Sequence, residues 1–214
     1  MFSASRPTDR TAPLWNASYE RDSCGVGLVV DIAGRPSREI VSRALAGLVN
    51  LTHRGGVGAD SRTGDGAGVL TQIPLGIFAE TLAGAGVRDV APGELGVLMA
   101  FLPTGDTEAA TARTALEDGL RSRGLAPLAW RVVPTDPTAL GEQAIASMPR
   151  IEQLLVLRPA GMAEEAFERE LFLARKAGVR AVQAAGIADL FVVSSSARTI
   201  IYKAFCLPRD LDGF

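Results

Sequence analysis

The segment 22–27 places Cys24 at the start of an apolar run, where it could act as a nucleophile. A thiol attacks as its thiolate, and a free α-amine, with a pKa of about 7.7 to 8.0, is suited to taking up the thiol proton. Cleavage between Ser23 and Cys24 would create that amine. These residue types predict an N-terminal nucleophile behind a propeptide at 1–23. An inert core thiol is the alternative, since free cysteine is often buried.

Two further segments, at 53–54 and 64–68, could assist this chemistry or could have only a structural role. His53 is the only histidine, and we expect it at a helix end, where an imidazole hydrogen-bonds the last carbonyls. Residues 64–68 read Gly-Asp-Gly-Ala-Gly, which matches neither the phosphate loop nor the dinucleotide fingerprint. The pattern favours a turn close to the nucleophile, with Asp65 as a turn residue rather than a catalytic acid.

Cysteine and charge content exclude several classes of protein. Two cysteines do not make a disulfide framework, and Cys206, in the apolar run 204–207, is predicted to be an inert residue of a core strand. The chain has 214 residues, 47% hydrophobic residues and a net charge of −2, with no basic cluster. We therefore expect one domain that binds neither nucleic acid nor a membrane. Residues 1–13 lack the apolar centre of a signal peptide, so a cytoplasmic location is predicted.

Hydrophobic periodicity predicts alternating strands and helices around the core. Ser37 is a predicted N-cap for a helix that runs to Val49 with an apolar face. Further helices are predicted at 77–82, 107–120 and 164–177, the last one stopped by Gly178. Predicted strands cover 26–32, 67–73, 95–102, 128–133 and 153–157, and a hairpin is predicted from 190–194 and 199–205. This pattern is typical of a layered α+β fold.

Several short motifs together resemble one family. They are residues 14–15, 20, 22–27, 44–45, 48–51, 53–55, 58–60, 63–68, 152–153, 170–175 and 194–203. In order and spacing this set is similar to the start of the large subunit of glutamate synthase, a class II glutamine amidotransferase domain of the N-terminal-nucleophile type. The resemblance implies a four-layer αββα sandwich, incomplete on its C-terminal side. Residues 24–214 would be its N-terminal portion, preceded by the propeptide.

The resemblance also implies roles for individual residues. Cys24 matches the family's catalytic nucleophile, and Arg54 matches the arginine beside it, whose charge would favour the thiolate and help hold the substrate. No metal ligand is predicted. The implied reaction hydrolyses L-glutamine to glutamate and ammonia through a Cys24 thioester, and the ammonia passes to 2-oxoglutarate for L-glutamate biosynthesis. The candidate substrate-binding residues are Gly25, His53, Asp65 and Gly66.

Further components are implied by the family resemblance. No cofactor is expected to bind this segment, whereas FMN, an iron-sulfur cluster and NADPH are implied for full-length members, with the remainder of the large subunit and a small subunit as partners. Family members continue past Phe214 into segments that bind the glutamine carboxylate and form the oxyanion hole, so the chain alone is expected to be nearly inactive. The alternatives are half of a split amidotransferase that needs a partner chain, and a non-catalytic binding or regulatory module with an uncut N-terminus.

Overall fold

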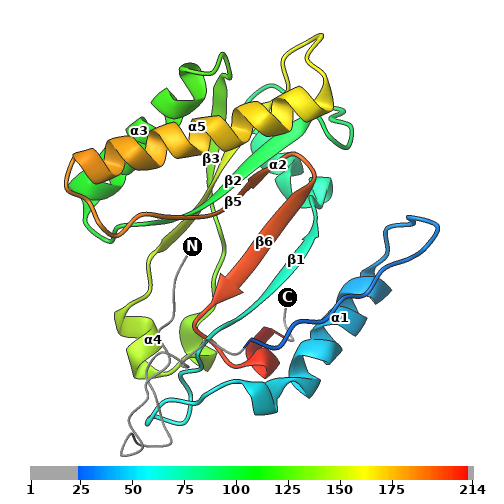
Figure 1. Ribbon diagram of the computed structural model, residues 1–214, viewed down its shortest axis with the longest axis vertical. Helices are drawn as coiled ribbons and strands as arrows, with labels where there is room; N and C mark the ends of the chain where they lie inside the picture. Colours follow the sequence, from blue (N-terminus) through cyan, green and yellow to red (C-terminus); the bar gives the residue numbers. More distant parts are fainter. Residues whose placement is uncertain (1–23, 212–214) are drawn as a thin grey trace, which may run out of the picture.

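Two antiparallel sheets lie between helices in the computed structural model, which describes residues 24–211 (Figure 1). One outer layer holds helices α3 (Asp106–Arg121) and α5 (Glu164–Ala184). A four-stranded sheet, a two-stranded sheet and helix α1 (Arg38–Asn50) follow in that order. This is the layered α+β sandwich expected from the sequence.

The four-stranded sheet is antiparallel throughout. Its strand order is β3 (Pro127–Val132), β4 (Arg150–Leu157), β2 (Leu95–Leu102), β5 (Phe191–Ser196). Central strand β2 is covered on both faces, because Leu98 belongs to the core beneath the helices and Met99 to the core between the sheets. A strand covered on both faces is a continuous apolar run, so its predicted range, 95–102, agrees with the observed one.

Helices α3 and α5 pack with their backbones in close contact, and this corrects one prediction. Gly178 does not stop α5, which continues to Ala184. A Cβ built on Gly178 would lie 3.0 Å from Cα of Leu116, and one built on Gly119 would lie 2.9 Å from the backbone nitrogen of Gly178. Gly178 is therefore an interface residue, because only a residue without a side chain permits this approach.

The two-stranded sheet pairs β1 (Ala67–Gln72) with β6 (Thr199–Ala204). The predicted hairpin of 190–194 and 199–205 is wrong, because β5 pairs with β2 and β6 pairs with β1. Between these two strands the chain passes from one sheet to the other, as Figure 1 shows. The hydroxyl of Ser194 accepts a hydrogen bond from the backbone N–H of Ile201 at 3.3 Å, so a side chain replaces the ladder of a hairpin.

A second apolar core fills the space between the sheets, where Phe78, Met99 and Ile200 are buried. Phe78 is the last residue of η3 (Leu75–Phe78), which leads into α2 (Ala79–Gly84), so the helical segment predicted at 77–82 is confirmed. Figure 1 shows α4 (Glu142–Ala146) at the lower left, at the opposite end of the molecule from α5. The remaining elements are η2 (Thr52–Arg54), η4 (Pro137–Ala139) and η5 (Pro208–Leu211).

Residues 26–32 have the alternating apolar pattern of a strand but do not form one. Within residues 24–211, no strand pairs with this segment. The prediction of a buried strand is therefore wrong: the period of two is present, but no strand in the described part of the chain hydrogen-bonds to this backbone or covers the apolar face. Exposed fractions lie between 64% and 102% for the alternate side chains Val26, Leu28, Val30 and Ile32.

Helix α1 begins where the sequence predicts it. Ser37 is the N-cap, and its hydroxyl accepts the backbone N–H of Ile40 at 3.4 Å. Of the predicted apolar face, Leu45 is buried and Val49 remains 42% exposed. Elsewhere, β1, β3, β4 and α3 confirm the elements predicted at 67–73, 128–133, 153–157 and 107–120. Among the described residues no helix has the length and apolar character needed to cross a membrane.

Candidate functional site

The backbone beside Cys24 lies against the turn that carries Arg54. A Cβ built on Gly25 would stand 3.5 Å from Cβ of Arg54 and 3.3 Å from Cδ1 of Leu51. The side chain of Cys24 is exposed. The structure therefore brings three of the predicted site residues, Cys24, Gly25 and Arg54, into one neighbourhood, and Gly25 lacks the side chain that would fill it.

The end of α1 determines where Arg54 stands. After Asn50 the chain tightens into η2, in which the backbone N–H of Arg54 bonds to the carbonyl of Leu51 at 2.8 Å. The hydroxyl of Thr52 donates to the carbonyl of Val49 at 2.6 Å, which satisfies one of the free carbonyls of the helix end. A helix that ends in this way projects the next side chains from a fixed turn.

His53 occupies the helix end that the sequence predicts for it. Its Nδ1 lies 3.1 Å from the carbonyl oxygen of Asn50, the last residue of α1. Arg54, the next residue, is exposed, and its side chain makes no hydrogen bond or ion pair with another residue of the range 24–211. A guanidinium with unused donors can bind a carboxylate in two-pronged fashion, so Arg54 is the group here suited to hold an anionic ligand.

Asp65 holds together the loop that follows Arg54. Its Oδ2 accepts the backbone N–H of Gly56 at 2.5 Å, and its own N–H bonds to the carbonyl of Gly56 at 3.3 Å. Val57 and Gly64 form an isolated antiparallel bridge just inside this pair. Residues 56–65 therefore form a short hairpin, and the Asp65 carboxylate hydrogen-bonds across the end of the hairpin where its two arms begin.

Gly66 joins this hairpin to β1. It has a φ of +122° and lies against the carbonyl of Ala204 in β6, which a built Cβ would approach to 3.2 Å. Gly64, within the hairpin, packs on the backbone of Cys206. A Cβ built on Gly64 would lie 2.5 Å from the carbonyl oxygen of Cys206. Both contacts tie the hairpin base to the end of the two-stranded sheet.

Cys206 does not share the exposure of Cys24. It is buried, as predicted, but it follows β6 rather than lying in a strand, because β6 ends at Ala204. Burial raises the pKa of its thiol. A buried thiol kept in its neutral form is a poor nucleophile, and of the two thiols only that of Cys24 is exposed.

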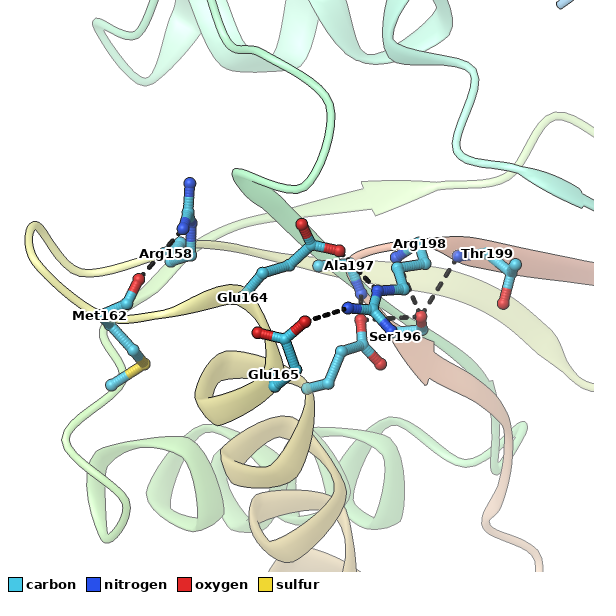
Figure 2. Close-up of polar contacts among 9 residues, drawn as sticks. Arg158, Met162, Glu164, Glu165, Ser196, Ala197, Arg198 and Thr199 are labelled. Atoms are coloured by element: carbon cyan, nitrogen blue, oxygen red, sulfur yellow. Dashed lines mark hydrogen bonds and ion pairs between the residues drawn. The ribbon is translucent and has the colours of Figure 1, made fainter. Parts of the chain in front are cut away.

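The segment 194–203, part of the family resemblance, forms an arch held by the first turns of α5. Arg198 forms ion pairs with Glu164 at 2.5 Å and with Glu165 at 3.2 Å. Figure 2 shows these three side chains together at the start of α5. Glu168 accepts hydrogen bonds from the hydroxyl of Ser196 at 3.0 Å and from the backbone N–H of Ala197 at 2.5 Å. Through these contacts, the residues of the arch and of α5 hold the segment in which the chain passes from one sheet to the other.

A cleft of about 700 Å³, lined by the ends of β2, β5 and β6 and by part of the segment 135–149, contains none of the predicted site residues. Phe101 and Phe191 form one wall, with ring centroids 6.3 Å apart. The Lys203 ammonium lies 4.1 Å from the centroid of Phe191. Apart from Lys203, at the end of the segment 194–203, the lining residues named here belong to no sequence motif, because the lining comes from segments far apart in the chain.

The donor atoms present do not fit an iron-sulfur cluster. Such a cluster takes four ligands, usually thiolates, and the chain has two cysteines, one exposed and one buried. Within residues 24–211, no three His, Cys, Asp or Glu side chains come together as metal ligands. The cluster implied for full-length family members therefore finds no ligand set among these residues.

Comparison with known proteins identifies the family to which the chain is similar. A family model described as "Glutamine amidotransferases class-II" matches residues 24–214. The chain is 37% identical over 215 residues to the glutamate synthase [NADPH] large chain of Azospirillum brasilense, covering 100% of this chain and 14% of that protein. It is 40% identical over 207 residues to ferredoxin-dependent glutamate synthase 2 of Synechocystis sp., covering 95% of this chain and 13% of that protein.

A plant protein matches over the same extent. The chloroplastic ferredoxin-dependent glutamate synthase of Oryza sativa subsp. japonica is 36% identical over 212 residues, covering 99% of this chain and 13% of that protein. The chain thus spans about one seventh of the length of these relatives, 13% to 14%. Since the family model covers the sequence from Cys24 onward, the chain belongs to the class II glutamine amidotransferases.

Proposed function

We propose that this chain is the glutamine-hydrolysing domain of a glutamate synthase and that Cys24, freed as the mature N-terminus, is its nucleophile. The packing of Gly25 against the Arg54 turn carries the proposal, because it brings the backbone of Cys24 next to a residue whose side chain is exposed and has no partner within residues 24–211. Exposure of Cys24 supports its reactivity. Removal of residues 1–23 is supported by a family match that begins at Cys24.

In the proposed reaction, the Cys24 α-amine takes the thiol proton and Sγ attacks the side-chain amide carbon of L-glutamine, forming a C–S bond. The amine then gives its proton to the leaving nitrogen, the C–N bond breaks, and ammonia departs. Water, deprotonated by the same amine, attacks the remaining thioester. The C–S bond breaks, which releases glutamate and restores the thiol.

The other candidate residues act around this nucleophile. Arg54 favours the thiolate and holds the substrate, and Gly25 leaves space for it. Asp65 and Gly66 support the loop after Arg54 through their backbone contacts. His53 is not required as a base, since its ring is engaged at the end of α1.

The ammonia, in this proposal, passes within a longer cytoplasmic protein to 2-oxoglutarate, yielding L-glutamate. The relatives are named as glutamate synthases of the NADPH or the ferredoxin-dependent kind. They are about seven times longer than this chain, which supports placing FMN, the iron-sulfur cluster and NADPH in other parts of the large subunit or in a small subunit. L-Glutamine is then the ligand of this domain.

The test is the intact mass and N-terminal sequence of the purified chain, before and after treatment with a diazo-ketone analogue of glutamine. We expect a terminus at Cys24 and one adduct on that residue. Labelling is a sharper readout than turnover because it requires a single attack. Cys206→Ser should label like the wild type, whereas Cys24→Ser should not label. An uncut terminus without adduct would contradict the proposal and favour a non-catalytic module; labelling only with an added chain would favour a split amidotransferase.

A further inference from the structure

Asp60 organises the tip of the hairpin 56–65. Its Oδ1 accepts the backbone N–H groups of Thr63 and Arg62 at 2.7 and 3.0 Å, and its Oδ2 accepts the hydroxyl of Thr63 at 2.6 Å. Between them, Ser61 has a φ of +58°, a conformation that non-glycine residues rarely adopt. The tip is thus built around one carboxylate.

The same carboxylate touches the start of α4. Hydrogen bonds lower the pKa of Asp60 to about 2, first from the Thr63 hydroxyl, then from the N–H groups of Thr63 and Arg62, with a smaller contribution from the backbone of Gln143 in α4. Asp60 is therefore ionised at neutral pH. Beside it, the Arg62 guanidinium donates to the carbonyl of Thr138 in η4. Two adjacent contacts dock the tip on the segment 137–146.

Gly141, the N-cap of α4, makes this docking close. A Cβ built on Gly141 would overlap Oδ2 of Asp60 and Oγ1 of Thr63 and come within 2.6 Å of the nitrogen of Thr63. The backbone of Gly141 has φ −78° and ψ 163°, which alanine adopts equally well. Glycine is required here only by the hairpin.

Few other contacts hold the hairpin. Most of residues 55–66 are exposed, and the base rests on the Asp65–Gly56 pair and on the packing of Gly64 against Cys206. The segment beneath the tip is anchored in the body of the domain, since Ala144 of α4 is buried. A loop with few buried contacts moves as a unit unless its tip is also fixed.

We propose that Asp60 is a positioning residue: by docking on the start of α4 it fixes the hairpin 56–65, and so the orientation of Arg54 relative to Cys24. Only Gly55 separates Arg54 from the hairpin, so a displacement of the hairpin moves the turn that carries the guanidinium. The catalytic consequence rests on the proposed function, whereas the placement of the hairpin does not.

The placement is tested by amide hydrogen exchange of the full chain. Asp60→Asn and Gly141→Ala break the docking from opposite sides, and each should speed exchange in residues 54–65 by roughly tenfold. Thr63→Val should do the same, and Thr63→Ser, which keeps the hydroxyl, should restore slow exchange. Asp31→Asn is the matched control, because Asp31 also accepts a backbone N–H in a local turn, from Ala33 at 2.7 Å, outside the hairpin.

The effect on Cys24 is read as a ratio of two alkylation rates, with the diazo-ketone glutamine analogue and with iodoacetamide. Asp60→Asn and Gly141→Ala should lower this ratio by roughly fivefold or more, since only the analogue needs Arg54 in place. A protein that merely unfolds would expose the thiol to both reagents. Asp31→Asn should leave the ratio unchanged.

Each result decides between the two proposals. Unchanged exchange in both Asp60→Asn and Gly141→Ala would show that Asp60 does not fix the hairpin. Faster exchange with an unchanged alkylation ratio would show that the hairpin does not orient Arg54 relative to Cys24, and either result would overturn Asp60 as a positioning residue. If the wild type is not labelled by the analogue at all, the proposed function fails. Faster exchange confined to 54–65 would still uphold the placement of the hairpin by Asp60.

Discussion

Gly119 of α3 and Gly178 of α5 meet backbone to backbone, with the nitrogen of Gly178 2.9 Å from the Cβ position of Gly119. This contact lets both helices lie close together over the four-stranded sheet. It brings Leu116 and Leu171, each fully buried, into one core with the strands. The separation of the helices from each other thus depends on two glycines.

Gly178→Ala should therefore destabilise the fold, because a Cβ there would lie 3.0 Å from both the carbonyl of Ala115 and Cα of Leu116. We expect a loss of about 1 to 3 kcal/mol in the free energy of unfolding, measured with urea. Gly47→Ala is the control, since nothing lies within 4 Å of its Cβ position in α1. That change should be neutral or stabilise by about 0.5 to 1 kcal/mol. Equal effects at both positions would contradict the explanation.

Glu168→Ala should weaken the arch between the sheets. The backbone N–H of Ala197, a buried residue, donates to Glu168, and loss of the carboxylate would leave it unsatisfied. We expect a cost of about 1 to 3 kcal/mol in unfolding free energy. Glu165→Ala, which removes a carboxylate that is 80% exposed from Arg198 in the same cluster (Figure 2), should cost about 0.5 kcal/mol or less. A larger loss from Glu165→Ala would assign the support to the surface ion pairs instead.

Stability should fall in mildly alkaline solution because of Cys206. Burial raises the pKa of this thiol in the folded chain, while the unfolded thiol ionises near its ordinary value of about 8.5. The unfolded state therefore loses its proton first, so the contribution to stability is complete below that value and is lost as pH rises toward the folded pKa. Urea midpoints measured from about pH 7 to about 9.5 should decline more steeply for the wild type than for Cys206→Ala. Parallel declines would show that another group is responsible.

The elements that were predictable from sequence are those whose signals are local. The eight-residue apolar run of β2 can be identified as a strand without knowing which strands lie beside it. Ser37 marks the start of α1 through its own hydrogen bond. The errors concern distant partners. Gly178 has the residue type of a helix end, but a second helix requires it, and residues 26–32 alternate like a strand without a neighbour among the described residues.

The candidate site shows the same limit. Cys24 could be named from its residue type and position, and the family resemblance identifies both Cys24 and Arg54. The structure adds the contact of Gly25 with the Arg54 turn. Asp60 lies in the segment 58–60, which is part of the family resemblance, but no role is predicted for it. Its partner Gly141 is far along the chain, and glycine at the start of a helix gives no sign of the hairpin packed on it.

The proposed role of the α-amine can be tested by moving the start of the chain. A protein expressed from Met followed directly by Cys24 should lose its initiator methionine and react with the diazo-ketone glutamine analogue without any other processing. Adding one alanine before Cys24 converts the amine to an amide, which has no useful basicity, so labelling by the analogue should fall by roughly two to four powers of ten. Mass spectrometry of the labelled proteins gives both rates, with iodoacetamide confirming that the thiol is reachable in each. Equal labelling of the two chains would mean that Cys24 needs no amine of its own, and the search for a base would turn to the groups around Arg54.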